Sequence, residues 1–226
     1  MVVTTFDQYK VTNGTVRWKT ADSYDTFQKL GCVGTLGLET ELKTVVKICE
    51  GDEVMSVDIP TRVNGTLVLH MPVPVFRKAF GLSNDGLTSG VYSYGTNSRP
   101  STGIVAFDVE DLFGELKKKI AFPNLTFSGG MNWQIENGGE EIAMIETSFK
   151  ALKDTNSKFY YEGFDSEITN EDVKTKWSEE FTPELVKNTA EGTAVQMSRM
   201  VEPESTDLET VVEEELEPES TDIETE

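Results

Sequence analysis

Residues 34–48 read GTLGLETELKTVVKI, and this stretch decides the class of fold. Apolar and charged side chains alternate along it, which is the period of a β-strand with one half-buried face. The apolar side chains on one parity are Leu36, Leu38, Leu42, Val46 and Ile48. The charged side chains on the other parity are Glu39, Glu41, Lys43 and Lys47. The stretch therefore predicts a long strand with two chemically different faces.

Turn signals and further alternating segments surround this strand. A turn is expected at residues 50–52, and alternation resumes over residues 54–59. The pairs Asn13-Gly14 and Asn64-Gly65 are typical of hairpin turns, because Asn-Gly readily adopts positive φ. Later strands are expected over residues 91–94, 103–109, 116–122, 140–152 and 159–164. The pattern predicts a mainly β (α+β) fold, an antiparallel β-sandwich or barrel.

Two helical segments are expected beside the strands. The first lies over residues 72–80 and ends at Gly81, which suits a C-terminal stop. The second begins after a cap at Thr169 or Asn170. Its apolar side chains repeat every four residues at Val173, Trp177 and Phe181. The lysine run at residues 117–119 indicates an exposed edge strand that resists promiscuous pairing.

The negative charge is concentrated at the C-terminus. The 226 residues carry a net charge of −20, and the 26 residues from Val201 to Glu226 hold twelve acidic and no basic side chains. The motif EPESTDLET at residues 202–210 recurs as EPESTDIET at residues 217–225. Such a like-charged segment without aromatic residues is predicted to be disordered. We therefore expect three parts: a β-rich domain at 1–167 with an N-terminal arm, a partly helical segment at 168–200, and the acidic tail at 201–226.

Composition argues against several functional classes. An acidic body offers no basic stripe to displace counterions from phosphates, so tight binding to nucleic acid or anionic membranes is not expected. The single histidine, His70, and the two cysteines, Cys32 and Cys49, fit neither an ordinary zinc site nor a disulfide framework. No nucleophile elbow, dinucleotide fingerprint or phosphate loop is present. We expect no enzyme activity, no cofactor, no signal peptide, and synthesis in the cytoplasm.

Five segments, in this order and spacing, resemble the major tail proteins of long, flexible-tailed phages that infect Gram-positive bacteria. They are GTLGLETELKTVVK at 34–47, PVFRKAFGL at 74–82, GVYSYGTN at 90–97, IAFPNLTFS at 120–128, and residues 146–163, where FKAL precedes FYYE. Their combined order carries the resemblance, which spans roughly residues 30–165. The acidic tail is not part of it.

The resemblance implies a structural subunit of the virion tail, made in the host cytoplasm. Such subunits close into rings, commonly of six copies, and the stacked rings form the conduit through which DNA is ejected. The implied partners are sister copies, other tail proteins at the ends of the tube, and passing DNA that is not bound specifically. On this reading the charged face of the long strand lines the channel. The lumen-facing candidates are Glu39, Glu41, Lys43 and Lys47.

Two other classes of function stay open. One is another virion β-sandwich, such as a head decoration protein, or a carbohydrate-binding module; these would be monomers or small closed oligomers. The other is an enzyme on a β scaffold, which requires a pocket with converging titratable groups, for example around His70.

Overall fold

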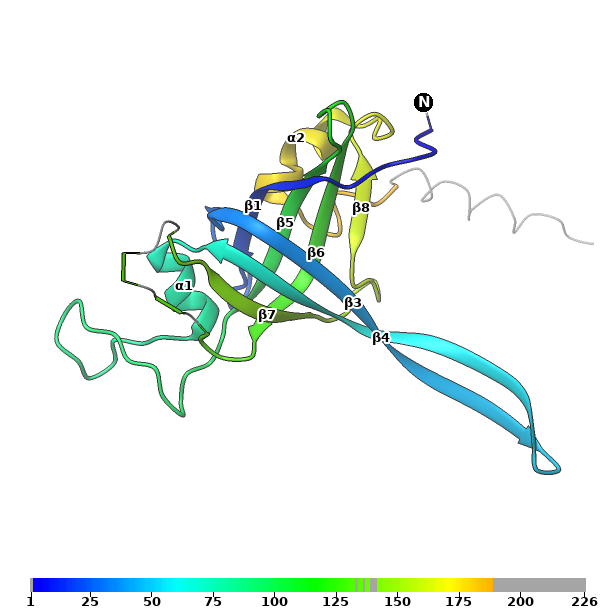
Figure 1. Cartoon of the computed structure of the whole chain (residues 1–226), viewed down its shortest axis with the longest axis horizontal. Coiled ribbons are helices and arrows are strands. Elements are labelled where there is room, and N and C mark those ends of the chain that lie inside the picture. The colour runs from blue at the N-terminus through cyan, green and yellow to red at the C-terminus, as the bar shows by residue number, and fades with distance from the viewer. Residues whose placement is uncertain (1, 133, 136, 139–141, 189–226) are drawn as a thin grey trace, which may run out of the picture. The chain divides into compact units, whose positions relative to one another are not determined.

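A single antiparallel sheet dominates the computed structural model, which describes residues 2–132, 134–135, 137–138 and 142–188. The described strands follow the order β2-β1-β5-β6-β7-β4-β3, and β8 also pairs with β6 (Figure 1). The mainly β, antiparallel class is thus confirmed, with two short helices beside the sheet. The elements are β1 (Lys10–Trp18), β2 (Gln28–Lys29), β3 (Cys32–Cys49), β4 (Asp52–His70), α1 (Val73–Phe80), β5 (Thr102–Glu110), β6 (Lys117–Ser128), β7 (Ile145–Ala151), β8 (Tyr161–Phe164) and α2 (Glu171–Glu180).

The sheet curls around its core without closing into a barrel. Its end strand β3 comes next to β1, so that a Cβ added at Gly14 would lie 3.1 Å from Cγ2 of Val33. Among the described residues no strand ladder joins β1 to β3. Large side chains from both halves of the curled sheet fill the space between them, among them Trp18, Leu67, Phe107, Phe122 and Phe149.

Helix α1 packs against this core, as the sequence predicts. Val75, Phe76, Ala79 and Phe80 are buried on one face of the helix. Gly81 ends it with φ of 69°, in the left-handed region. A Cβ at that position would lie 2.2 Å from the carbonyl oxygen of Arg99, so glycine is required there for space as well as for conformation.

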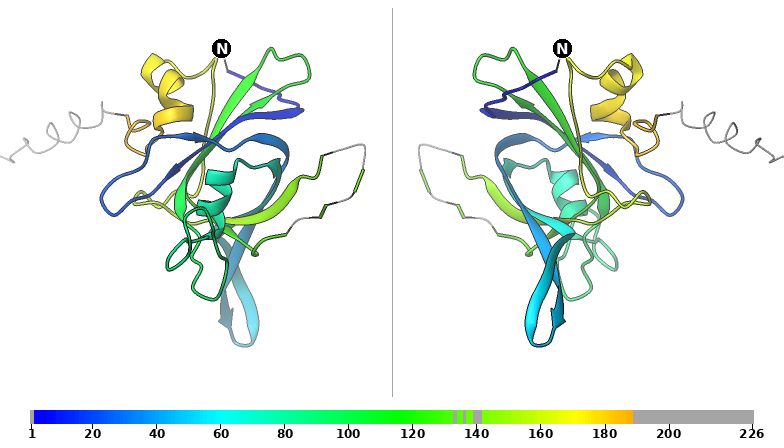
Figure 2. Two further views of the ribbon diagram at one scale, coloured as in Figure 1. Left: turned by 90° about the vertical axis from the view of Figure 1, so that its left-hand side faces the viewer. Right: turned by 90° about the vertical axis from the view of Figure 1, so that its right-hand side faces the viewer.

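Helix α2 covers the opposite face of β5 and β6 (Figure 2). Oδ1 of Asn170 accepts hydrogen bonds from the backbone N–H groups of Asp172 (2.9 Å) and Val173 (3.4 Å), which confirms the predicted cap. The apolar stripe packs on residues that point away from the main core. This second cluster contains Ile104, Ala106, Ala121, Val173, Trp177 and Phe181. Strands β5 and β6 are consequently buried on both faces.

Both predicted Asn-Gly turns are wrong. Asn13 and Gly14 lie inside β1, where the register with β5 shifts between Thr12 and Thr15 and Asn13 has φ of 52°. The pair therefore forms a bulge. Gly65 lies inside β4, beneath the ring of Phe149, and a Cβ there would be 2.2 Å from Cζ of that ring. Glycine is needed at position 65 because the ring of Phe149 packs directly against the backbone there, and the chain makes no turn.

The lysine run does not mark an exposed edge. Strand β6 is central, with β5 on one side and β7 and β8 on the other. Lys118 and Lys119 are buried, because carboxylates compensate their charges: Nζ of Lys118 lies 3.4 Å from Oε2 of Glu162, and Nζ of Lys119 lies 3.5 Å from Oδ1 of Asp108. Alternation cannot reveal such pairing, since the acidic partners lie on other strands.

Other strand boundaries also differ from the predictions. Residues 91–94 belong to a loop that holds only an isolated bridge between Ser83 and Ser93. Glycines with positive φ at 86 and 90 bend this loop away from extended geometry. Strand β6 continues through Pro123, because the ladder with β5 is already interrupted there by a register shift. The predicted acidic tail at 201–226 lies outside the described residues.

Candidate assembly site

The outer half of the β3–β4 hairpin projects from the sheet as a two-stranded ribbon (Figure 1). The two strands pair along their whole length, but β7 covers only residues 63–69 of β4. Beyond that point lie residues 42–60, which we call the arm. Its strands are joined by a tight turn in which Glu50 and Gly51 have φ of 54° and 94°.

The arm exposes apolar side chains on both of its faces. Direct cross-strand partners include Val45 with Val57 on one face and Leu42 with Pro60 on the other. Large apolar side chains with at least 40% of their surface exposed occur throughout the arm. They are Leu42, Val45, Val46, Ile48, Val54, Met55, Val57 and Ile59. A surface of this kind marks an interaction site, because an isolated two-stranded ribbon has no core to bury it.

Both long edges of the arm are also open. In the described part of the chain, no strand pairs with the outer edge of β3, and none but β3 pairs with residues 52–62 of β4. Unpaired backbone N–H and C=O groups along such edges are templates for another strand. The arm therefore combines apolar faces with backbone edges that can accept a partner.

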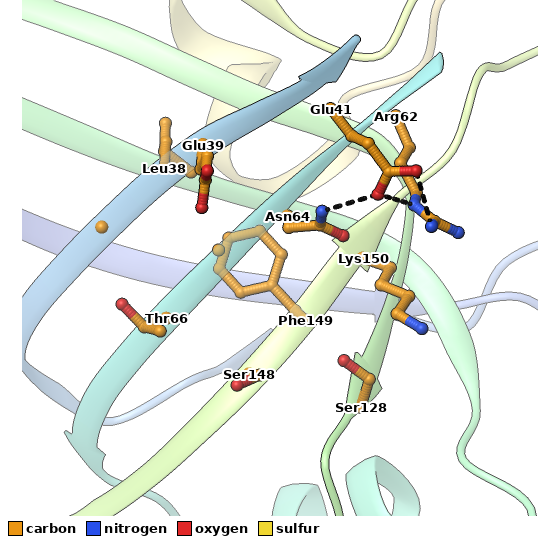
Figure 3. Close-up of a pocket in the computed structure, with 12 residues that line it drawn as sticks. Leu38, Glu39, Glu41, Arg62, Asn64, Thr66, Ser128, Ser148, Phe149 and Lys150 are labelled. Atoms are coloured by element: carbon orange, nitrogen blue, oxygen red, sulfur yellow. Dashed lines mark hydrogen bonds and ion pairs between the residues drawn. The ribbon is translucent and has the colours of Figure 1, made fainter. Parts of the chain in front are cut away.

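An ion pair joins the two strands at the root of the arm. Nε and Nη2 of Arg62 lie 2.6 and 2.8 Å from the two carboxylate oxygens of Glu41, and Nδ2 of Asn64 donates to Oε2 of Glu41 at 3.2 Å (Figure 3). The hydrogen bonds from Arg62 and Asn64 lower the pKa of the Glu41 carboxyl below its ordinary value. This bidentate geometry fixes the side chains where the ribbon leaves the sheet.

The same face of the sheet carries a polar hollow of about 540 Å³ (Figure 3). Hydroxyl, amide and charged side chains from β3, β4, β6 and β7 line it beside Leu38 and Phe149, and they include two carboxylates and two cations. The polar members are Glu39, Glu41, Arg62, Asn64, Thr66, Ser128, Ser148 and Lys150. The formal charges of this lining cancel, so the hollow lacks the basic excess that phosphate binding needs.

The four lumen candidates lie on one side of β3. Glu39 and Glu41 line the polar hollow, whereas Lys43 and Lys47 lie farther out on the arm, opposite Ile59 and Met55. Glu41 is ion-paired, a contact that strand alternation could not reveal. That these side chains face a channel stays a prediction.

Sequence alternation missed the exposure of the apolar residues of the arm. It predicted one buried face on β3, yet residues 42–48 are exposed on both faces because no second layer covers them. The signal was present in Val45-Val46 and Val54-Met55, adjacent apolar pairs that place one member on each face.

The described residues hold no group of three or more His, Cys, Asp or Glu side chains that could bind a metal ion. His70 ends β4 opposite Cys32. None of the described helices is both long and apolar enough to span a membrane.

No protein-family model matches the chain, and no curated protein sequence matches it significantly. Among the solved structures with a distant likeness to the chain, the following three each have a TM-score of 0.38. A chain of the tube-terminating cap of the anti-feeding prophage is 11% identical, with 72% of this chain and 99% of that one covered. A chain of the sheath–tube complex of an extracellular contractile injection system, PVC, is 9% identical, with 66% and 87% covered. A chain of the anti-feeding prophage baseplate is 8% identical, with 72% and 97% covered. A likeness this distant transfers no property to the present chain.

Proposed function

We propose that the chain is a structural subunit of a phage tail tube and that copies of it assemble through the arm. The observation that supports this proposal most strongly is the arm itself, which has eight exposed large apolar side chains and two unpaired strand edges. The ordered resemblance of five segments to major tail proteins supports the tail assignment. On this proposal the protein acts by assembly and not by catalysis.

The physical reason for assembly is the removal of the arm from water. Full burial of one Val, Leu, Ile or Met side chain contributes roughly 1.5–3 kcal/mol. Residues of the arm such as Ile48 and Val54 are more than half exposed in a single copy, so most of this contribution becomes available only when another copy covers them. Contacts with sister copies would also satisfy the open backbone edges.

The two open edges differ, which favours head-to-tail contacts. One edge belongs to β3 and the other to β4. If the β3 edge of one copy pairs with the β4 edge of the next, every contact in the series is the same. The series closes into a ring when the rotation between neighbouring copies is a whole fraction of a full turn. We propose rings of six copies, stacked in the virion tail around a channel for DNA ejection. Other tail proteins would cap the ends of the tube.

The polar hollow is our candidate for the surface that faces DNA. Glu39 and Glu41 are balanced there by Arg62 and Lys150, so the face offers hydration without a basic stripe. DNA would pass such a wall without counterion release and hence without being held. Lys43 and Lys47, the other two lumen candidates, lie farther out on the arm, beyond this balanced face.

Electron microscopy of the purified full chain tests the proposal. We expect rings or tubes from the unsubstituted protein. A variant with Val45→Ser, Val46→Ser, Val57→Ser and Ile59→Ser should stay monomeric by light scattering and keep the circular dichroism spectrum of the parent. The matched control is Val91→Ser with Leu87→Ser in the loop after α1, where both side chains are also exposed; it should assemble normally.

Each other outcome of this experiment points elsewhere. A monomeric full chain at high concentration would refute the proposal. A small closed oligomer of fixed size would favour a decoration protein, and specific retention on a polysaccharide would favour a carbohydrate-binding module.

A further inference from the structure

A groove lies at the root of the arm, on the core side of β3, where the curled sheet stays open. It consists of two adjoining hollows of about 500 and 400 Å³ that share Gln8, Leu38, Lys118 and Tyr160. The first also contacts Pro60 of the arm. Apolar lining comes from several strands, with Val33, Leu36, Val63, Val109 and Ile120 among its members. The groove is thus an apolar recess directly beside the arm.

The charged side chains that line this groove are all lysines. Its lining includes Lys10, Lys118 and Lys158 and no acidic residue, in a chain whose net charge is −20. Glu110 and Glu162 lie behind two of these lysines, at 3.8 and 3.4 Å from Nζ of Lys10 and Lys118. Lys158 forms no ion pair in the described part of the chain. The positive charge that remains unpaired in the groove is therefore that of Lys158, and it suits an occupant that is both apolar and acidic.

The tip of the arm has that composition. Residues 50–53 read EGDE, three carboxylates in four positions. They are flanked by Ile48 and Val54, whose side chains are 66% and 56% exposed. The tight turn holds these groups together on an ordered hairpin end, so little conformational freedom is lost when they dock.

We infer that the tip of the arm of one copy seats in the groove at the root of the arm of the next copy. Ile48 and Val54 enter the apolar recess, and the carboxylates of residues 50–53 meet its lysines. The inference rests on the proposed function, since it names the seat for the arm on a sister copy. Charge complementarity selects this seat over the polar hollow, where acidic and basic side chains are balanced.

The position of the groove makes this contact repeat. The tip is the far end of the ribbon (Figure 1), whereas the groove is lined by Pro60 at its root, so a tip cannot reach the groove of its own chain. About nine residues of extended strand separate them, a span of roughly 30 Å. Each docking step therefore displaces the next copy by about the length of the arm, which gives a head-to-tail series.

Disulfide trapping tests the seat directly, because Cys49 is native to the tip and exposed. In the full chain with Cys32→Ser, Gln8→Cys places a second thiol in the groove. Mild oxidation should give a ladder of dimers and higher multimers on a non-reducing gel, since a disulfide requires Cα atoms within about 7 Å. The matched control, Asp22→Cys, is exposed but outside the groove and should give no ladder.

Charge reversal provides a second readout. Lys158→Glu should raise the concentration needed for half-maximal assembly by about tenfold, because it adds an acid opposite three others. Glu50→Lys with Glu53→Lys in the same chain should reverse most of that shift. Lys153→Glu reverses the charge of an exposed lysine outside the groove and should change the concentration needed for half-maximal assembly by less than about twofold.

The two proposals fail in different ways. Tubes from the parent chain, with no ladder from the Gln8→Cys variant or with equal effects of Lys158→Glu and Lys153→Glu, would overturn the seat and leave the assembly proposal standing. A parent chain that neither assembles nor cross-links would overturn both.

Discussion

The inner and outer halves of the β3–β4 hairpin are made by the same two strands and have opposite environments. In the inner half, residues 63–69 of β4 pair with β7, and Leu67 and Leu69 are buried in the core. In the outer half, side chains of the same type, such as Val57 and Ile59, are 44% and 47% exposed. The two halves contain the same types of apolar side chain. They differ because other parts of the fold cover the inner half and leave the outer half exposed.

This difference separates two uses of apolar side chains. Those of the inner half stabilise the fold of one copy, because they leave water when the chain folds. Those of the outer half leave water only when another molecule covers them. Substitutions in the two halves should therefore affect different measurements, unfolding for the inner half and assembly for the outer half.

The largest expected effect on folding comes from the inner half. Phe149→Ala removes a fully buried ring that lies 5.5 Å from the ring of Phe122 and should lower the free energy of unfolding by about 3–5 kcal/mol. Urea unfolding followed by circular dichroism measures it. Val57→Ser in the arm should stay within about 0.5 kcal/mol of the parent in the same assay under monomeric conditions. Equal losses would abolish the distinction between the halves.

Gly65→Ala should have the next largest effect. The added methyl group would lie 2.2 Å from Cζ of Phe149, so ring or strand must move, at a cost of about 1–3 kcal/mol in the free energy of unfolding. Phe149→Leu in the Gly65→Ala background frees part of that space. The double variant should lose less stability than the sum of the two single variants, and additive losses would contradict the close-packing role of Gly65.

Alkaline pH should lower the free energy of unfolding through Tyr160. Burial raises the pKa of its phenol, and so does the hydrogen bond that the phenol donates to Oε2 of Glu162 at 2.6 Å. In the unfolded chain the Tyr160 phenol ionises near pH 10, whereas in the folded chain it keeps its proton. The contribution of Tyr160 to the free energy of unfolding is therefore fully present below about pH 10 and is lost as the pH rises further. Urea unfolding at a series of pH values measures this slope. Tyr160→Phe should reduce the slope, and an unchanged slope would contradict the assignment.

The smallest expected effect belongs to a polar contact in the arm. Oγ1 of Thr44 donates to Oδ1 of Asp58 at 2.7 Å, and both residues are exposed. Asp58→Ala should change the free energy of unfolding by less than about 0.5 kcal/mol in monomeric protein. A loss above 1 kcal/mol in urea unfolding would indicate that the outer half contributes to folding after all.

Local signals in the sequence predicted the elements that local physics controls. The stop at Gly81 and the cap at Asn170 both depend on backbone groups within a few residues, and both are confirmed. The period of two along β3 likewise predicted a strand correctly. The length of β4 was underestimated, because Asn64-Gly65 looks like a turn in the sequence. Only the structure shows that the ring of Phe149 packs over Gly65 and that the strand continues.

Features that depend on distant residues could not be predicted. Burial of Lys119 requires Asp108 on β5, and the ion pair of Glu41 requires Arg62 on β4. The arm could not be recognised from β3 alone, since its exposure follows from where β7 stops. For the candidate site, the sequence placed Glu39 and Glu41 on one side of β3, where both line the polar hollow. It did not reveal that the apolar side chains of the arm are exposed on both faces, or that lysines from separate strands line the groove.

Strand β4 runs without a break from the turn of the arm to His70. Tension on the arm would therefore travel along one backbone into the ladder between β4 and β7, which spans seven residue pairs. Those inter-strand bonds lie across the direction of pull, so they share the load and must yield together. A pulled arm would then resist extraction far better than a flexible loop of equal length, which suits the role that we propose for it, namely to hold one molecule to the next under mechanical stress.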